Sequence, residues 1–320
     1  MQKRRFGNTK LEVSILGFGA AEIGFEGTDD RTVDKLLGVA QEVGINVIDT
    51  AVMYRDSEEK IGRSLVGRRD EFLIFTKCGR YLPPRWTLPG LGLRILRKVK
   101  RATPSNGYDA IDWHPTALRW DIDESLRRLR TERIELLLLH SCSEDMLRRG
   151  DVVEVLQRAR EAGKISHIGY SGDGPALRYA ISCGEFAAVE MSINIADQEA
   201  IDNALPLAQK SGLGVIAKRP IANGLWRSLQ RPDEDKNVAY WERLHDLNYN
   251  FLRSADGFGH ALRFTISIPG VHTALVGTTN PGHVRQNAQS VEHGLINESE
   301  FKEIRGQWKN IAKSSWLVQM

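Results

Sequence analysis

The sequence predicts a (β/α)₈ TIM barrel, because three features recur along its 320 residues. Eight short apolar runs read as strands, helix-like segments separate them, and most runs end in a polar, ionisable or glycine residue. Strands buried on both faces read as near-continuous apolar runs, and helical crossovers make such strands parallel. The length suits this barrel, so we expect one domain over residues 1–320, with its functional site at the carboxyl ends of the strands.

An N-terminal β-hairpin is predicted ahead of the barrel. Two strand-like segments, Arg4–Phe6 and Leu11–Ile15, flank the turn-forming pair Gly7-Asn8. The predicted barrel strands follow in chain order: Ile15–Phe18, Ile45–Ile48, Phe72–Phe75, Ile134–Leu139, Ile165–Ile168, Ala187–Val189, Gly214–Ala217 and Ala274–Val276. The residues at or just beyond the ends of these runs are Gly19, Asp49, Lys77, His140, Ser171, Glu190, Lys218 and Gly277.

Two segments are too long for ordinary strand-to-helix loops, namely 79–115 and 220–255. Both follow predicted strands, so they are expected over the C-terminal face, where long loops usually shape a pocket. Within the first, the basic cluster Arg94–Arg101 is more typical of a solvated amphipathic helix than of a membrane or nucleic-acid patch.

Composition narrows the class of protein. A net charge of +3 and a pI of about 8.7 suit an anionic small ligand but are too weak to indicate nucleic-acid binding. No run approaches the roughly 20 apolar residues of a membrane helix, and the charged N-terminus lacks the apolar stretch of a secretory signal. Three cysteines without C-x-x-C spacing favour a reducing compartment, here the cytoplasm. No metal motif is present, and no signal indicates a particular oligomeric state.

Four residues near adjacent strand ends suit one reaction. A buried lysine needs a carboxylate partner, and Asp49 can supply one to Lys77. A lysine beside a phenol lowers the pKa of the phenol from about 10, which would make Tyr54 a usable general acid near neutral pH. His140 can orient a substrate oxygen by a hydrogen bond. Singly, each residue has a plainer structural interpretation, as an ion pair, a packing residue or a strand end, but together they favour protonation of a carbonyl oxygen during hydride transfer.

At these residues the chain resembles the aldo-keto reductase superfamily. The segments that carry the resemblance are Gly44–Ala51 with Tyr54, Ser57–Gly62, Phe75-Thr76-Lys77, Ser125–Leu129 through Leu139-His140, and Gly163–Ser171. The resemblance runs nearly end to end apart from the two long segments. It implies a (β/α)₈ barrel, reduction of a small-molecule carbonyl substrate with NADP(H) rather than NAD(H), and Asp49, Tyr54, Lys77 and His140 as the catalytic set.

The same resemblance implies a set of cofactor-binding positions. They are Gly19, Ser171, Glu190, Arg219, Pro220, Ile221, Gly277, Thr278, Thr279, His283, Gln286 and Asn287. Several depart from the family pattern: Gly172 replaces an asparagine, Glu190 a glutamine, Ile193 an aromatic residue, and Arg219 a serine. The family's basic residues for the 2′-phosphate fall at Gly277 and His283, so the preference for NADP(H) is a family default. Asn280-Pro281 also reads as a helix start, whose free amides suit an anion.

Several alternatives stay open at this stage. Glu190 could favour the oxidised, positively charged nicotinamide, or it could pair with Lys218 or Arg219. The whole protein could be a non-catalytic sensor on the same fold, or a Schiff-base lyase that uses Lys77 or Lys218. The thiols of Cys78 and Cys142 lie next to catalytic positions and could be reactive, although a packing role is favoured.

Overall fold

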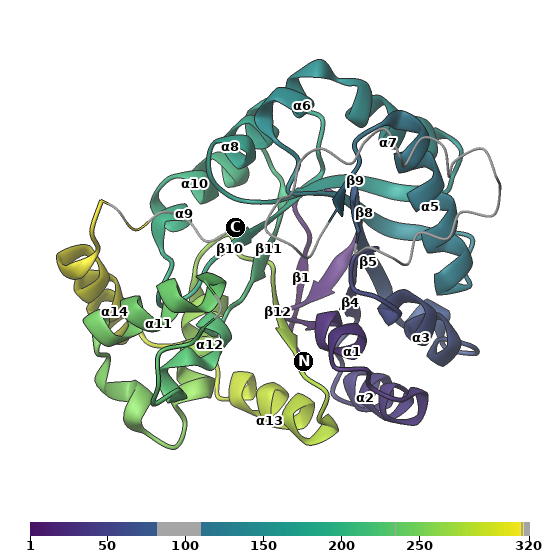
Figure 1. Cartoon of the computed structure of the whole chain (residues 1–320). Coiled ribbons are helices and arrows are strands. Elements are labelled where there is room, and N and C mark those ends of the chain that lie inside the picture. Colours follow the sequence, from purple (N-terminus) through teal and green to yellow (C-terminus); the bar gives the residue numbers. More distant parts are fainter. Residues whose placement is uncertain (82–109, 234, 315, 317–320) are drawn as a thin grey trace.

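A closed barrel of eight parallel strands confirms the predicted fold (Figure 1). The structure is a computed structural model, and it describes residues 1–81, 110–233, 235–314 and 316. The barrel strands are β3 (Leu16–Gly19), β4 (Val47–Asp49), β5 (Leu73–Cys78), β8 (Ile134–His140), β9 (Ile165–Ser171), β10 (Ala188–Ser192), β11 (Gly214–Lys218) and β12 (Thr273–Gly277). They lie around the barrel in chain order, and β12 pairs with β3 to close it.

Helices connect the strands and form the outer layer. In chain order they are α1 (Ala21–Phe25), α2 (Asp30–Glu42), α3 (Ser57–Ser64), η1 (Arg69–Glu71), α5 (Pro115–Leu129), α6 (Glu144–Arg149), α7 (Asp151–Glu161), α8 (Gly174–Ser182), α9 (Glu199–Asp202), α10 (Ala204–Lys210), η2 (Ala222–Arg227), α11 (Asp235–Leu247), η3 (Asn250–Arg253), α12 (Gly257–Ser267), α13 (Pro281–Glu292) and α14 (Glu298–Ile311). Caps fix where several begin: Asp29 accepts from the amide of Thr32 at α2, and Asn297 forms a capping box with Glu300 at α14.

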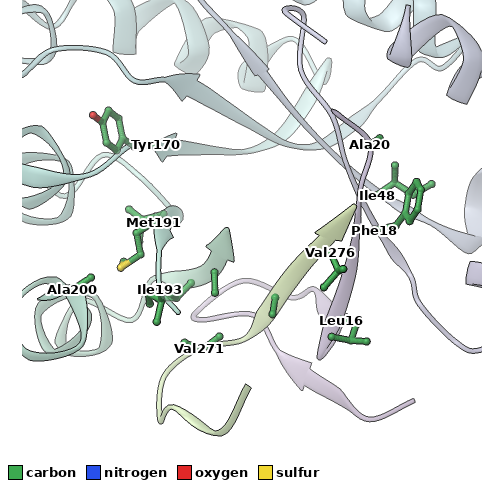
Figure 2. Packing of buried hydrophobic residues seen from close by; sticks show 14 of the residues in the cluster. Leu16, Phe18, Ala20, Ile48, Tyr170, Met191, Ile193, Ala200, Val271 and Val276 are labelled. Carbon is green, nitrogen blue, oxygen red and sulfur yellow. The ribbon is translucent and has the colours of Figure 1, made fainter. Parts of the chain in front are cut away.

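Two hydrophobic layers hold the barrel. The outer layer lies between strands and helices, and Figure 2 shows part of it, including Phe18 and Ile48 on the paired strands β3 and β4. The inner layer fills the barrel, and its members are Phe6, Val13, Val47, Phe75, Leu136, Leu138, Ala188, Ile216 and Leu275. Two of these belong to the predicted N-terminal hairpin, β1 (Lys3–Arg5) with β2 (Glu12–Ser14), so the hairpin closes the floor of the barrel.

The two long segments differ from simple loops where the structure describes them. Segment 220–255 contains η2, α11 and η3, so most of it is helical. In segment 79–115, β6 (Arg80–Tyr81) pairs antiparallel with β7 (Ala110–Ile111), and the cluster Arg94–Arg101 lies outside the described residues. Within the described parts of the chain, no helix is long and apolar enough to cross a membrane.

Candidate active site

Side chains alternate along each strand, and those that point into the barrel change from apolar residues to polar residues toward the carboxyl ends of the strands. On six of the eight barrel strands, a residue of the inner layer and the residue two positions later point the same way. The interior-facing pairs are Val47 and Asp49, Phe75 and Lys77, Leu138 and His140, Ala188 and Glu190, Ile216 and Lys218, and Leu275 and Gly277. The register places Gly19 beside Asp49 and Gly277, and Ser171 beside His140 and Glu190. The predicted strand-end residues therefore form one polar layer above an apolar interior.

Lys77 lies at the centre of this layer between two carboxylates. Its side chain is fully buried, and Asp49 and Glu190 are each 3% exposed. The ammonium group donates hydrogen bonds to Asp49 Oδ1 and, at 3.2 Å, to the carbonyl of Thr50. Glu190 Oε2 lies 3.3 Å from Lys77 Nζ. Glu190 therefore pairs with Lys77, which reaches across the barrel to it, rather than with Lys218 or Arg219, the partners that the sequence left open as an alternative.

The two carboxylates keep Lys77 charged. Burial alone would lower the pKa of Lys77, but Asp49, Glu190 and Tyr54 together raise it above its ordinary value. Burial raises the pKa of Asp49, Lys77 opposes this, and Glu190 adds to it. A protonated Lys77 is a poor nucleophile, and Lys218 forms an ion pair of 2.9 Å with Asp173. These contacts argue against a Schiff-base lyase.

Tyr54 and His140 lie together beside Lys77. The two rings meet edge to face at 6.1 Å between centroids, and Lys77 Nζ lies 5.3 Å from the centroid of the Tyr54 ring. Phe25 of α1 packs on the other side of Tyr54, with centroids 5.7 Å apart. The structure thus brings all four predicted catalytic residues together.

The expected lowering of the pKa of Tyr54 is not found, because burial outweighs the effect of Lys77. Burial raises the pKa of Tyr54 to about 12; Lys77 lowers it, but Asp49, Glu190 and Glu22 oppose Lys77. The prediction from the sequence weighed Lys77 against neither the burial of the phenol nor the opposing acids. Burial and then the cations Lys77 and Arg80 also lower the pKa of His140 well below its usual value, so this imidazole is neutral at pH 7.

Three buried polar atoms of this group make no hydrogen bond within the described residues. They are Asp49 Oδ2, His140 Nδ1 and Glu190 Oε2, and the last of these keeps its ion pair with Lys77. Buried polar atoms without partners are uncommon, and at a functional site they often await a ligand or water. Their shared location at the barrel mouth suits a polar ligand that contacts strands β4, β8 and β10.

The strand ends next to Glu190 explain why Gly172 and Ile193 depart from the family pattern. A Cβ atom at Gly172 would lie 2.4 Å from the hydroxyl of Tyr170, so an asparagine does not fit there. Ile193 is fully buried and offers no face for stacking. Ser171, 1% exposed, remains beside Glu190 as a polar group for a carboxamide.

Arg219 occupies the turn after β11 but faces β10. Its φ of 54° is unusual for a residue other than glycine, and its Nη1 donates to Ser192 Oγ at 3.3 Å. The adjoining backbone is fixed, because Thr265 donates to the carbonyl of Pro220 at 2.8 Å. Ile221 lies next in this turn and is half-buried.

The predicted adenosine-binding positions form a separate group after β12. Gly277, Thr278 and Thr279 lead into α13, where the side chain of Asn280 accepts from the amide of Gly282 at 2.8 Å. The remaining predicted positions on this helix are His283, Gln286 and Asn287, and His283 Nδ1 lies 3.1 Å from Thr278 Oγ1. The turn after β11, with Arg219, could hold phosphates, and the buried polar atoms at the barrel mouth could hold a carboxamide. The residues present therefore fit a nicotinamide dinucleotide.

Three residues at the candidate site were not predicted from the sequence. Asp173 accepts from the amide of Ser192 at 2.7 Å and orders the ends of β9, β10 and β11. Glu22 and Glu26 lie against the loop after β12. The signal for Glu22 was present, since it lies three residues beyond the end of the first strand at Gly19, but it was read only as a missing glycine of a dinucleotide motif.

The cysteines have no reactive features. Cys78 is fully buried and burial raises its pKa well above the usual value, while burial raises the pKa of Cys142 to about 12. Low-pKa thiols need a positive field and access to solvent. Both thiols therefore act as packing groups.

Known proteins resemble this chain along almost its full length. A family model described as the Aldo/keto reductase family matches residues 15–309. L-galactose dehydrogenase of Arabidopsis thaliana is 25% identical over 344 residues, which cover 100% of this chain and 99% of the relative. The NADH-specific methylglyoxal reductase of Escherichia coli is 26% identical over 323 residues, with 92% and 95% covered.

A solved structure agrees with these sequence matches. The holo form of aldo-keto reductase AKR11C1 from Bacillus halodurans superposes with a TM-score of 0.80 at 25% identity, and 99% of each chain is covered. The family match, the barrel and these relatives lead to one conclusion: the chain belongs to the aldo/keto reductase family and is an NAD(P)H-dependent oxidoreductase.

Proposed function

We propose that this protein reduces an aldehyde or ketone to an alcohol, with Tyr54 as general acid and Lys77, Asp49 and His140 as its supporting groups. The observation that carries the proposal is the contact of Tyr54 with both Lys77 and His140 at the mouth of the barrel. The whole chain, residues 1–320, acts as one reductase domain. Its free cysteines suit the cytoplasm.

Proton transfer follows from the charges of the site. Tyr54 keeps its proton at neutral pH because its pKa lies near 12, so it can donate to a carbonyl oxygen as negative charge develops there. Lys77 then stabilises the phenolate that remains. His140 is neutral, so one ring nitrogen can donate a hydrogen bond to the same oxygen and orient it.

A bound reduced nicotinamide cofactor would supply the hydride to the carbonyl carbon, which would give an alcohol and the oxidised cofactor. Ser171 and Glu190 lie where they can hold the carboxamide end. The turn Arg219, Pro220 and Ile221 and the loop Gly277, Thr278 and Thr279 lie where they can hold the two phosphates and the adenosine. Family resemblance alone favours NADP(H), but one relative is named NADH-specific, so cofactor preference varies within the family.

A carbonyl panel tests the activity. The relatives are named for L-galactose and methylglyoxal, so the panel should include aldoses and small α-oxoaldehydes. Loss of NADPH or NADH absorbance with any member, abolished in Tyr54→Phe, is the expected result. Tight cofactor binding without turnover of any carbonyl or alcohol would instead indicate a non-catalytic sensor.

A further inference from the structure

We propose that this protein prefers NAD(H) to NADP(H), and that Glu22 and Glu26 set this preference. The inference rests on the proposed cofactor site and concerns its adenosine end. NADP(H) differs from NAD(H) by a 2′-phosphate, which carries about −1.5 to −2 charges at neutral pH and needs basic or donor groups around it. NAD(H) has a 2′-hydroxyl there, which a carboxylate can accept from.

Two carboxylates lie against the loop that would receive the 2′-phosphate. Glu22 is so close to Gly277 that a Cβ atom there would lie 2.0 Å from its Oε2. A basic side chain at position 277, as the family pattern has, would therefore displace Glu22. Glu26 Oε2 accepts a hydrogen bond from Thr279 Oγ1 at 3.0 Å. Both acids come from α1 and the residue after it, so β3 and β12 bring them to the loop by pairing in register.

The loop after β12 and helix α13 themselves carry few cations that could offset these acids. From Gly277 through the end of α13 the sequence contains one arginine, Arg285, and no lysine. Arg285 forms a bidentate pair with Glu42 at the end of α2, at 2.5 and 2.6 Å. Figure 1 shows α13 beside α2, which explains the contact. His283, at the family's second basic position, contacts Thr278.

The first turn of α13 offers little compensation. Asn280 already accepts from the amide of Gly282, and Pro281 has no amide proton. A 2′-phosphate on this loop would therefore face two acids with few donors. We expect NAD⁺ to bind about tenfold or more tightly than NADP⁺ at moderate salt, and the gap to narrow as salt screens the repulsion.

Binding measurements test this without turnover. Dissociation constants for NAD⁺ and NADP⁺ are measured by quenching of tryptophan fluorescence, together with AMP and adenosine 2′,5′-bisphosphate as fragments. In the double variant Glu22→Gln/Glu26→Gln, NADP⁺ and the bisphosphate should gain about tenfold or more relative to NAD⁺ and AMP. Glu298→Gln on α14 makes the same type of charge change far along the chain and should leave the ratio unchanged.

A second variant guards against misfolding of the first. Thr279→Arg places a cation on the same loop and should move the preference further toward NADP⁺. Tighter binding of NADP⁺ than NAD⁺ by the wild type, or an unchanged ratio in both variants, would overturn the inference and leave the proposed reductase intact. Binding of neither dinucleotide would overturn the proposed function as well.

Discussion

The nicotinamide end and the adenosine end of the proposed cofactor site are built differently. At the nicotinamide end, strand register fixes Asp49, Lys77 and Glu190, which point into the barrel and are almost fully buried. At the adenosine end, a loop and the start of a helix present half-buried or exposed side chains such as Thr279 and His283. Under the proposed function, the chemistry would therefore depend on the barrel itself, whereas cofactor preference would depend on which neighbouring loop supplies the charges.

Replacement of Lys77 should have the largest effect. Lys77→Met leaves Asp49 and Glu190 together without a cation, and breaking a buried ion pair typically costs about 3–5 kcal/mol. We expect the free energy of unfolding to fall by that order and carbonyl reduction to fall by about 10³ or more. Urea unfolding and steady-state rates measure the two effects.

A matched control separates stability from chemistry. Arg69 forms a largely buried ion pair of 2.8 Å with Glu135, which directly follows the start of β8 at the floor of the barrel. Glu135 keeps a second partner in Arg133 at 3.2 Å, so Arg69→Met should destabilise the protein by less than Lys77→Met and keep its rate per folded molecule. Equal loss of that rate in both variants would remove Lys77 from the chemistry.

Removal of the Tyr54 hydroxyl should lower carbonyl reduction by about 10²–10⁴, the usual worth of general acid catalysis. Tyr54→Phe keeps the ring against Phe25 and His140, so cofactor affinity and unfolding should stay near wild type. Because the pKa of Tyr54 is about 12, kcat/KM for reduction should stay flat through neutral pH and fall only as alkaline pH removes the proton. Alcohol oxidation, which needs the phenolate, should rise with pH. Near-normal reduction by the variant would exclude Tyr54 as the acid.

The sequence predicted the first of the two ends better than the second, for a physical reason. Side chains alternate with a period of two along a strand, and this alternation together with the eight strand ends is enough to place Asp49, Lys77 and His140 in one layer. Backbone geometry fixes the direction in which these side chains point. Glu22 reaches Gly277 only because β3 and β12 are neighbours in the closed barrel, a contact between residues more than 250 positions apart. The prediction for the pKa of Tyr54 was wrong for a similar reason, because that pKa depends on burial and on acids that different parts of the barrel contribute.

Truncation of His140 should cause a smaller, substrate-dependent loss of about 10–10². The neutral imidazole orients the carbonyl oxygen and does not donate the proton that is transferred. Because burial and nearby cations hold its pKa well below the usual value, His140 should add no ionisation to the wild-type rate profile between pH 6 and 8. His140→Ala should thus lower kcat/KM without changing the shape of that profile. An ionisation in this range that disappears in the variant would contradict the neutral state.

The smallest effect, and the one that best links both ends, is expected from Glu190. Its carboxylate shares Lys77 with Asp49 and lies beside the proposed site of the nicotinamide ring. At roughly 6 Å and an effective dielectric of about 20, one charge interacts by about 3 kcal/mol before screening, and a third of that changes an affinity ratio several-fold. Wild type should therefore favour the oxidised cofactor, and Glu190→Gln should reduce the ratio of oxidised to reduced affinity several-fold.

Glutamine can also donate to the carboxamide, which would tighten both forms and leave the ratio as the measure of charge. Glu190→Asp keeps the charge and serves as the control. Equal ratios in wild type and both variants, measured by tryptophan quenching, would mean that Glu190 only holds Lys77 in place.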